Sequence, residues 1–345
     1  MRLRRVRDAA VVLAIAVGAA ACQVLPAVGS HAVNPGSSRP RTNPVPVPTT
    51  ISRTTARRVT TGVYVPDPSS GSSVWRDALD QFDADAGVRP QLVQWYVPWA
   101  SNAPFPTAEA NLVRSRNQVP LITWEAWDWS GGADQAAYSL SAILAGRYDS
   151  YMAAWAQGAR QYAGTIYLRV LAEANGNWNP WDPGVNGNTV SEYVQAWRHI
   201  RDVVRAAGAS NIVWLWTPNV EFAGSTPLAS IYPGDAYVDI VGLDGYNWGT
   251  TQPWSSWQSF GAVFDSSIAN LRAITTKPLW ITEVASAEQG GDKAQWIRAA
   301  IRAVHDDARI SGFVWFDANK ETDWRIESSP TAQAAFRAAI PSLGT

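Results

Sequence analysis

The chain of 345 residues contains one cysteine, Cys22, and three histidines, His31, His199 and His305. A single cysteine excludes an internal disulfide. Three scattered histidines cannot supply a zinc site of the usual kind or a Ser-His-Asp triad, and we expect His199 and His305 to be surface residues of helices. We therefore expect neither a metal nor a cofactor.

Basic residues are scarce in most of the chain. Nine arginines and a single acidic residue, Asp8, precede Val59, and removing these from the totals of 28 basic and 29 acidic residues leaves 19 and 28. A net charge of −9 after that point would repel phosphates, which argues against a nucleic-acid partner and suits a neutral ligand. The same part holds all 19 tryptophans. That is more than its core should use, so we expect several to line a cleft and stack on sugars.

The apolar run at positions 9–21 is too short to span a bilayer as a stable helix. Arginines at positions 2, 4, 5 and 7 precede it, which predicts that residues 1–30 are an export signal peptide. Cys22 follows three alanines and resembles the lipidated cysteine of a bacterial lipobox, ordinary cleavage nearby being the alternative. Residues 31–58, rich in Pro, Ser, Thr and Arg, predict a disordered linker. We expect a secreted or envelope-attached monomer, with a lipid at Cys22 as its one membrane contact.

Residues 59–345 alternate short apolar runs with amphipathic patterns. Thr189 with Glu192 predicts a capping box at one helix start, and Asp292 predicts the cap of another. Continuous apolar strands between helices predict a parallel sheet covered on both faces, and eight of them predict a (β/α)₈ TIM barrel in a single catalytic domain. An open doubly wound sheet is the alternative, but no Gly-rich phosphate loop follows the first strand. The eight runs are 62–65, 92–96, 120–124, 166–171, 212–216, 238–243, 279–282 and 312–316.

Two glutamates, Glu173 and Glu283, lie at the ends of the fourth and seventh predicted strands. Functional residues of such barrels lie at the carboxyl ends of strands, and these two ends face each other across the opening. A carboxyl separation of about 5–5.5 Å would fit hydrolysis with retention, in which Glu283 is the nucleophile and Glu173 the acid/base. One such glutamate is more often a salt-bridged rim residue, but two beside tryptophans favour a glycosidase.

Other candidates surround this pair. Trp178, Trp181 and Trp248 follow strands in loops, where sugar stacking is favoured over local packing. Arg169 faces inward from the fourth strand, and we expect it to pair with a carboxylate at the substrate site. Glu125, at the end of the third strand, either contacts substrate or pairs at the rim.

Residues from about 62 to 328 resemble glycoside hydrolase family 26, best known for β-mannanases. Each motif alone is weak, but together they occur in the family's order over nearly the whole body. The matching blocks are 94–97 (QWYV), 123–125 (TWE), 145–149 (AGRYD), Arg169 with 173–178 (EANGNW), 242–248 (GLDGYNW), Glu283 and 323–325 (DWR).

The resemblance implies the same roles for Glu173 and Glu283. It also implies that Tyr246 supports the nucleophile, that Trp315 floors the sugar site, and that Asn175, inside a matching block, contacts substrate. One position departs: Ala172 stands where the family commonly has a histidine that helps hold the sugar.

We expect endo cleavage of a β-linked polysaccharide, first of all β-1,4-mannan. A β-glucan or β-xylan is the alternative within the class. A carbohydrate-binding pseudoenzyme is the alternative outside it.

Overall fold

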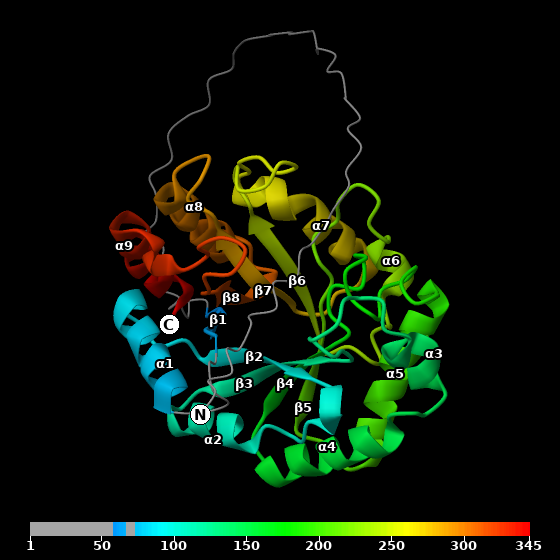
Figure 1. The fold of residues 1–345 in the computed structure, drawn as a ribbon. Coiled ribbons are helices and arrows are strands. Elements are labelled where there is room, and N and C mark those ends of the chain that lie inside the picture. The colour runs from blue at the N-terminus through cyan, green and yellow to red at the C-terminus, as the bar shows by residue number, and fades with distance from the viewer. Residues whose placement is uncertain (1–57, 67–72) are drawn as a thin grey trace, which may run out of the picture.

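The computed structural model describes residues 58–66 and 73–345, so the proposed signal peptide, Cys22 and nearly all of the linker lie outside the described residues. Eight parallel strands pair in chain order and close into a barrel (Figure 1). The (β/α)₈ prediction is confirmed. The strands are β1 (Thr60–Tyr64), β2 (Leu92–Pro98), β3 (Val119–Glu125), β4 (Ile166–Val170), β5 (Ile212–Trp216), β6 (Ile240–Asn247), β7 (Leu279–Ser286) and β8 (Ile310–Phe316).

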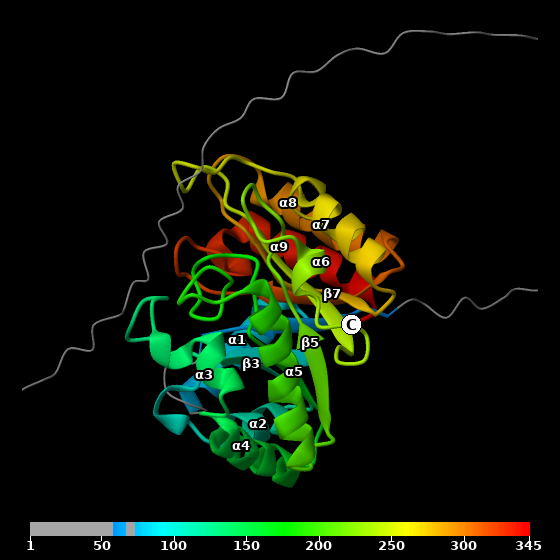
Figure 2. The same ribbon diagram turned by 90° about the vertical axis from the view of Figure 1, so that its right-hand side faces the viewer.

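Helices surround the barrel (Figures 1 and 2). The ring closes where α9 packs against both α1 and α8, and the Val59 N–H donates to the Leu343 carbonyl at 2.9 Å. Within the described ranges, no helix combines the length and the apolar character that a membrane crossing requires. The helices are α1 (Ser73–Ala86), α2 (Thr107–Ser115), α3 (Leu140–Leu144), α4 (Asp149–Tyr162), α5 (Val190–Ala206), α6 (Leu228–Ile231), α7 (Phe260–Ile274), α8 (Lys293–Asp306) and α9 (Pro330–Ala339).

Local sequence signals fix several helix starts. The Thr189 side chain accepts from the Glu192 backbone N–H, and the Glu192 side chain accepts from the Thr189 N–H, which is the predicted capping box of α5. Asp292 caps α8 by accepting from the Gln295 N–H at 2.8 Å. Both capping side chains accept hydrogen bonds from backbone N–H groups that have no partner inside the helix. Each helix therefore starts where the sequence predicts.

The barrel interior is layered. Because side chains alternate along a strand, every second residue faces inward. The lower layer is an apolar plug, and the layer above it is polar and buried, which places the chemistry at the carboxyl ends of the strands. The plug consists of Leu92, Leu121, Leu215, Ile240, Trp280 and Val314.

Among the strands that run past their predicted ends, β6 and β7 extend furthest. β6 continues to Asn247 and β7 to Ser286, so Glu283 lies inside β7 and not at its end. The predicted strands stopped just before Asp244 and Glu283, where the continuous apolar runs end. Here Asp244 and Glu283 both pair with Arg169, and they stay in the ladder as register partners.

Candidate active site

Glu283 reaches the barrel interior through a bulge in β7. The pairing with β6 shifts between Leu243 and Asp244, so one extra residue of β7, Thr282, precedes the Asp244–Glu283 pair. A bulge lets two consecutive side chains face the same side of a sheet. Thr282 Oγ1 donates to Asp244 at 2.7 Å, while Glu283 turns toward β4 and binds Arg169.

Four neighbours donate hydrogen bonds to the Glu283 carboxylate. Its Oε1 atom accepts from Arg169 Nη1 at 2.6 Å, from the Tyr96 hydroxyl at 2.5 Å and from Gln94 Nε2 at 2.9 Å. Its Oε2 atom accepts from the Tyr246 hydroxyl at 2.6 Å. The donors come from β2, β4 and β6, so the barrel framework holds this carboxylate from three directions.

These donors decide the charge of Glu283. Burial alone would raise its pKa, but the Arg169 guanidinium and the two tyrosine hydroxyls outweigh it and lower the pKa below the usual value. Burial and the Glu283 charge raise the pKa of Tyr96 and Tyr246 well above the ordinary range, so both keep their protons and donate. Glu283 is therefore an ionised carboxylate at neutral pH.

Glu173 sits on a constrained turn at the end of β4. Its φ of +57° and the φ of +46° at Leu171 lie in the left-handed region, which for residues other than glycine costs about 1–3 kcal/mol each. The Glu173 N–H donates to the Thr217 carbonyl at 2.7 Å, which ties this turn to the end of β5. The turn places the Glu173 carboxyl group at the mouth of the barrel.

The Glu173 carboxyl group accepts two neutral donors: Asn219 Nδ2 at 2.7 Å and the Trp178 indole Nε1 at 3.0 Å. The Trp178 ring lies over Gly176, where a Cβ atom would come within 2.6 Å of it. Burial, followed by the charge on Glu283, raises the pKa of Glu173. Glu173 is thus suited to hold a proton.

Oxygen atoms of Glu173, Asp244 and Glu283 lie within 4.8 Å of one another. This set could offer ligands to a cation, but Arg169 already contacts Asp244 at 2.5 Å as well as Glu283. A guanidinium between two of the three carboxylates repels a metal ion. Within this set, burial raises the pKa of Glu173, whereas the donors around Glu283 outweigh its burial and lower its pKa. Two glutamates at close range whose pKa values are moved apart suit acid/base and nucleophilic chemistry.

Exposed aromatic rings gather at this mouth. Among described residues the exposed large hydrophobic side chains include three aromatics, Trp129, Phe222 and Trp254, and each lies in a loop after a barrel strand. Trp178 stacks on Phe222 with ring centroids 5.7 Å apart, and Trp248 packs edge-on against Trp254 at 5.3 Å. Trp178 and Trp248 therefore lie against exposed aromatic rings at the barrel mouth.

Three residues predicted to bind substrate are buried instead. Trp181 is 1% exposed, and its indole donates to the Ala172 carbonyl at 2.8 Å. Trp315 is fully buried and packs on Trp296 of α8 and Phe336 of α9, because strand alternation turns it out of the barrel. Its neighbour faces the mouth in its place: Phe316 contacts Tyr64 and Tyr246.

Asn175 is the third correction. It is fully buried, and its amide bonds both the N–H and the carbonyl of Asn219, which fixes the residue that contacts Glu173. Arg169 pairs with a carboxylate as expected: it is 1% exposed and holds Glu283 by a contact of 2.6 Å.

Sequence reasoning gave no role to Gln94, Asn219 or Asp244. The sequence held a clue to Gln94 and Asp244. Both are polar residues inside apolar strands, where a buried polar group needs a hydrogen-bond partner. Asn219 follows Trp216 in a loop and carries no such signal.

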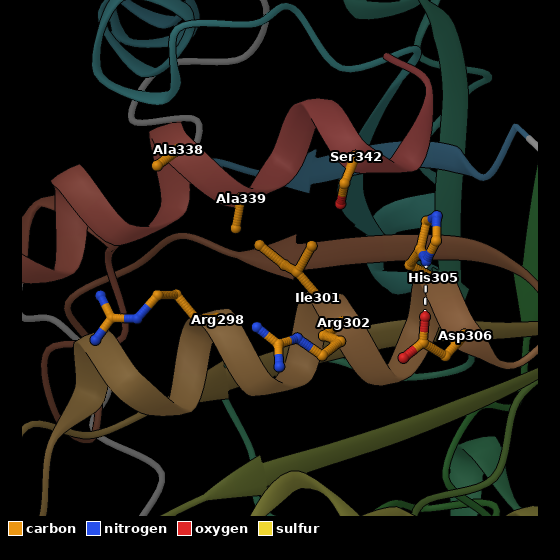
Figure 3. A pocket seen from close by; sticks show the side chains of 8 residues that line it. All are labelled: Arg298, Ile301, Arg302, His305, Asp306, Ala338, Ala339 and Ser342. Atoms are coloured by element: carbon orange, nitrogen blue, oxygen red, sulfur yellow. Dashed lines mark hydrogen bonds and ion pairs between the residues drawn. The ribbon is translucent and has the colours of Figure 1, made fainter. Parts of the chain in front are cut away.

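A separate hollow of about 450 Å³ lies in the outer helix layer between α8 and α9. Figure 3 shows Arg298, Arg302 and His305 along α8 with Ala339 across from them. His305 pairs with Asp306 at 2.8 Å. The hollow holds no pair of carboxyl groups, so the chemistry described above belongs to the barrel mouth.

Comparison with known proteins agrees with the fold. The model of "Glycosyl hydrolase family 26" matches residues 116–323. Endoglucanase H of Acetivibrio thermocellus is 40% identical over 275 residues, which is 78% of this chain and 29% of that protein. A mannan endo-1,4-beta-mannosidase of Bifidobacterium adolescentis is 38% identical over 101 residues, covering 28% of this chain and 10% of that protein. The chain thus matches less than a third of the length of either relative.

Solved structures share the fold. The catalytic domain of a Bacillus sp. JAMB-750 endo-beta-1,4-mannanase superposes with a TM-score of 0.60 at 17% identity, over 83% of this chain and 87% of that one. An endo-beta-1,4-mannanase of Cellulomonas fimi gives a TM-score of 0.61 at 19% identity, over 82% and 70%. At such identities the likeness shows a shared barrel.

Proposed function

The chain belongs to glycosyl hydrolase family 26, and we propose that it hydrolyses a β-linked polysaccharide internally, with retention at the anomeric carbon. The observation that carries this proposal is the Glu173–Glu283 pair. The two carboxyl groups lie within 4.8 Å, and their neighbours move their pKa values in opposite directions. Retaining enzymes hold such groups about 5–5.5 Å apart, whereas inverting enzymes leave room for a water.

In the first step Glu283 attacks the anomeric carbon as the bond from that carbon to the glycosidic oxygen breaks. Its Oε1 atom already accepts three hydrogen bonds, while Oε2 accepts only from Tyr246, so Oε2 has the lone pair for attack. Glu173 gives its proton to the departing oxygen, which leaves as a hydroxyl group.

In the second step Glu173, now ionised, takes a proton from water. The water oxygen attacks the anomeric carbon and releases Glu283 as a carboxylate. Arg169 and the two tyrosines stabilise that charge in both the resting and the released state.

For the substrate we place a β-glucan before a β-mannan. The match to a protein named an endoglucanase covers 78% of this chain, whereas the match to a mannosidase covers 28%. Ala172 stands where the family resemblance leads one to expect a histidine that helps hold the sugar, so the side chain beside the acid/base differs from the one expected for the family. Mannan, the substrate expected from the resemblance, remains the second candidate.

The anomeric configuration of the first product tests the mechanism. We expect proton NMR to show the β-anomer before mutarotation, and the α-anomer first would contradict retention. We expect Glu283→Ala to lose hydrolysis and to regain cleavage with azide, which attacks the anomeric carbon in place of the carboxylate and gives an α-glycosyl azide. Unchanged hydrolysis by this variant would overturn the assignment of Glu283.

Reducing-end release from β-glucan, glucomannan, galactomannan and xylan tests the substrate. We expect the highest kcat/KM on β-glucan. Higher kcat/KM on galactomannan would reverse our order, and binding without release from any of them would favour a carbohydrate-binding protein without turnover.

We also propose export, with Cys22 lipidated. The support is the sequence alone: four arginines before an apolar run that ends at three alanines. Cys22→Ser should move the protein from the membrane fraction to the medium, and an unchanged distribution would contradict lipidation.

A further inference from the structure

Glu125 and Trp129 lie at the barrel mouth but have no part in the two-step mechanism. Along β3, Leu121 belongs to the interior plug, whereas Trp124 is buried outside it against Trp155 of α4. Strand alternation therefore turns Glu125 inward, toward the opening. Trp129 follows four residues later in the loop after β3.

The two side chains hold each other. The Trp129 indole Nε1 donates to Glu125 Oε2 at 2.6 Å, and within the described residues it is the one hydrogen-bond donor to that carboxyl group. The Trp129 ring itself is 43% exposed. A large ring fixed by its polar edge and open on its face presents a flat apolar surface to solvent.

The loop that carries Trp129 is ordered by its own hydrogen bonds. Trp127 is buried and donates to the Gly132 carbonyl at 3.2 Å. Gln135 Nε2 donates to the carbonyls of Asp128 and Gly132 at 2.8 and 2.6 Å. The loop that holds Trp129 at the surface is thus fixed by internal hydrogen bonds.

Among the described residues, Glu125 accepts a hydrogen bond from Trp129 and forms no salt bridge. The charged groups that face it are Glu283 of β7, Arg169 of β4 and Lys320 after β8, and burial followed by the Glu283 charge raises the pKa of Glu125 to about 7. Arg169 is held by Glu283 and Asp244, and Lys320 pairs with Glu321 at 2.9 Å. A half-buried carboxyl group that forms no ion pair is stabilised by further polar partners, because burial removes water from it. A neutral ligand with hydroxyl groups supplies such a partner.

We propose that Glu125 and Trp129 form a sugar-binding subsite beside the cleavage point, in which the Glu125 carboxyl group bonds a sugar hydroxyl and the Trp129 ring stacks on the sugar face. This inference rests on the proposed function and deepens it. A neutral sugar offers both hydroxyl groups and an apolar C–H face, which matches the two halves of this pair. Thr123, two residues before Glu125 on the same face of β3, is the register partner of Arg169. Glu125 therefore faces the same barrel opening as the catalytic pair.

The test compares wild-type protein with Trp129→Ala, Trp129→Phe and Glu125→Gln on the polysaccharide that the wild type cleaves best. We expect Trp129→Ala to raise KM about tenfold, the change that ~1.4 kcal/mol corresponds to, with kcat kept. Trp129→Phe keeps a ring and loses the indole donor, so its KM should lie between. Asp202→Asn, an exposed carboxylate near the end of α5, is the matched control and should leave KM unchanged.

The pH dependence of KM separates binding from a merely structural role. Wild-type KM should change near pH 7, where Glu125 titrates, and Glu125→Gln should remove that change. Unchanged KM in all three variants, or a loss of kcat with KM kept, would overturn the subsite. Melting curves confirm that each variant is folded, and Trp129→Phe replaces Trp129→Ala should the latter unfold.

Failure of the subsite and failure of the proposed function give different results. If Glu283→Ala is inactive and the Glu125 and Trp129 variants keep the wild-type KM and kcat, only the subsite is contradicted. An active Glu283→Ala contradicts the function on which it rests.

Discussion

At the scale of single residues, the donors around each carboxyl group separate two otherwise identical side chains. Glu283 accepts four hydrogen bonds, one of them from a guanidinium, whereas Glu173 accepts two from neutral groups. Hydrogen bonds and positive charge favour the ionised form, and burial opposes it. The balance falls on opposite sides for the two residues, which supports the proposed roles of Glu283 as nucleophile and Glu173 as acid without reference to any relative.

Tyr246→Phe tests the donors to Glu283. Losing the hydroxyl that donates at 2.6 Å removes stabilisation of the ionised form, so the pKa of Glu283 rises. Because Glu283 must be ionised to attack, the acidic limb of kcat/KM should move upward by about one pH unit or more, since a hydrogen bond to a charged group is worth ~1.5–3 kcal/mol. The measurement is kcat/KM against pH.

Tyr237→Phe is the matched control for this variant. Tyr237 lies on the outer surface under Arg198 and Arg201, so its loss of a hydroxyl should leave the acidic limb in place. An acidic limb that moves downward in Tyr246→Phe would contradict the role of Tyr246.

Asn219→Ala tests the donors to Glu173. The amide donates at 2.7 Å to the carboxyl group and stabilises its ionised form, so removing it raises the pKa of Glu173 further. Because Glu173 must be protonated in the first step, the basic limb of kcat/KM should move to higher pH while the acidic limb stays. Movement of the acidic limb instead would exchange the proposed roles of the two glutamates.

Sequence patterns predict which residues approach the site better than they predict which way each one faces. In β8 both Trp315 and Phe316 are apolar, so the sequence pattern does not show which of the two faces the barrel interior. In the structure Phe316 faces inward. Asn219 and Glu173 meet only through folding, 46 residues apart. The four strand-borne donors to Glu283 likewise come together only when the barrel closes.

At the scale of elements, the eight apolar runs suffice to predict the strands because each must be buried on both faces. Their ends are less predictable. The β7 bulge depends on the pairing of Thr282 and Glu283 with Asp244, which the sequence does not reveal. Helix starts are more predictable, since Thr189, Glu192 and Asp292 bond backbone groups of their own helices.

The residue that follows helix α4 has a backbone conformation that is unfavourable for any side chain larger than that of glycine. This allows a stability test. Ala163 follows the helix with φ of +58° and is exposed. Ala163→Gly should stabilise the protein by ~1 kcal/mol, because the left-handed conformation costs an alanine about 1–2 kcal/mol that glycine does not incur. Urea unfolding should show a higher midpoint with the same slope.

Ala154→Gly in the same helix is the matched control with the opposite sign. Ala154 is exposed in the helix interior, where glycine costs ~1 kcal/mol relative to alanine. A lower midpoint in both variants would contradict the argument from the Ala163 backbone.

At the scale of the whole molecule, the exposed aromatic rings are distributed around one end of the barrel. Trp129 follows β3, whereas Phe222 follows β5 and Trp254 follows β6. In the closed barrel order, the strands of the catalytic pair, β4 and β7, separate β3 from β5 and β6. Rings on more than one side of the cleavage point indicate a cleft that a polymer crosses, since a pocket for a chain end needs a wall on one side. The hollow between α8 and α9, with its arginines, offers no such surface.

This arrangement predicts internal cleavage. The viscosity of a polysaccharide solution should fall steeply while few reducing ends have formed, because cuts near the middle of a chain shorten it most. Phe222→Ala and Trp254→Ala should each raise KM for the polymer several-fold, about the effect of losing ~1 kcal/mol of aromatic contact. Arg302→Ala, in the helix-layer hollow of Figure 3, should leave KM unchanged. Viscosity that falls only in proportion to reducing ends would mean attack from chain ends, and these rings would then need another explanation.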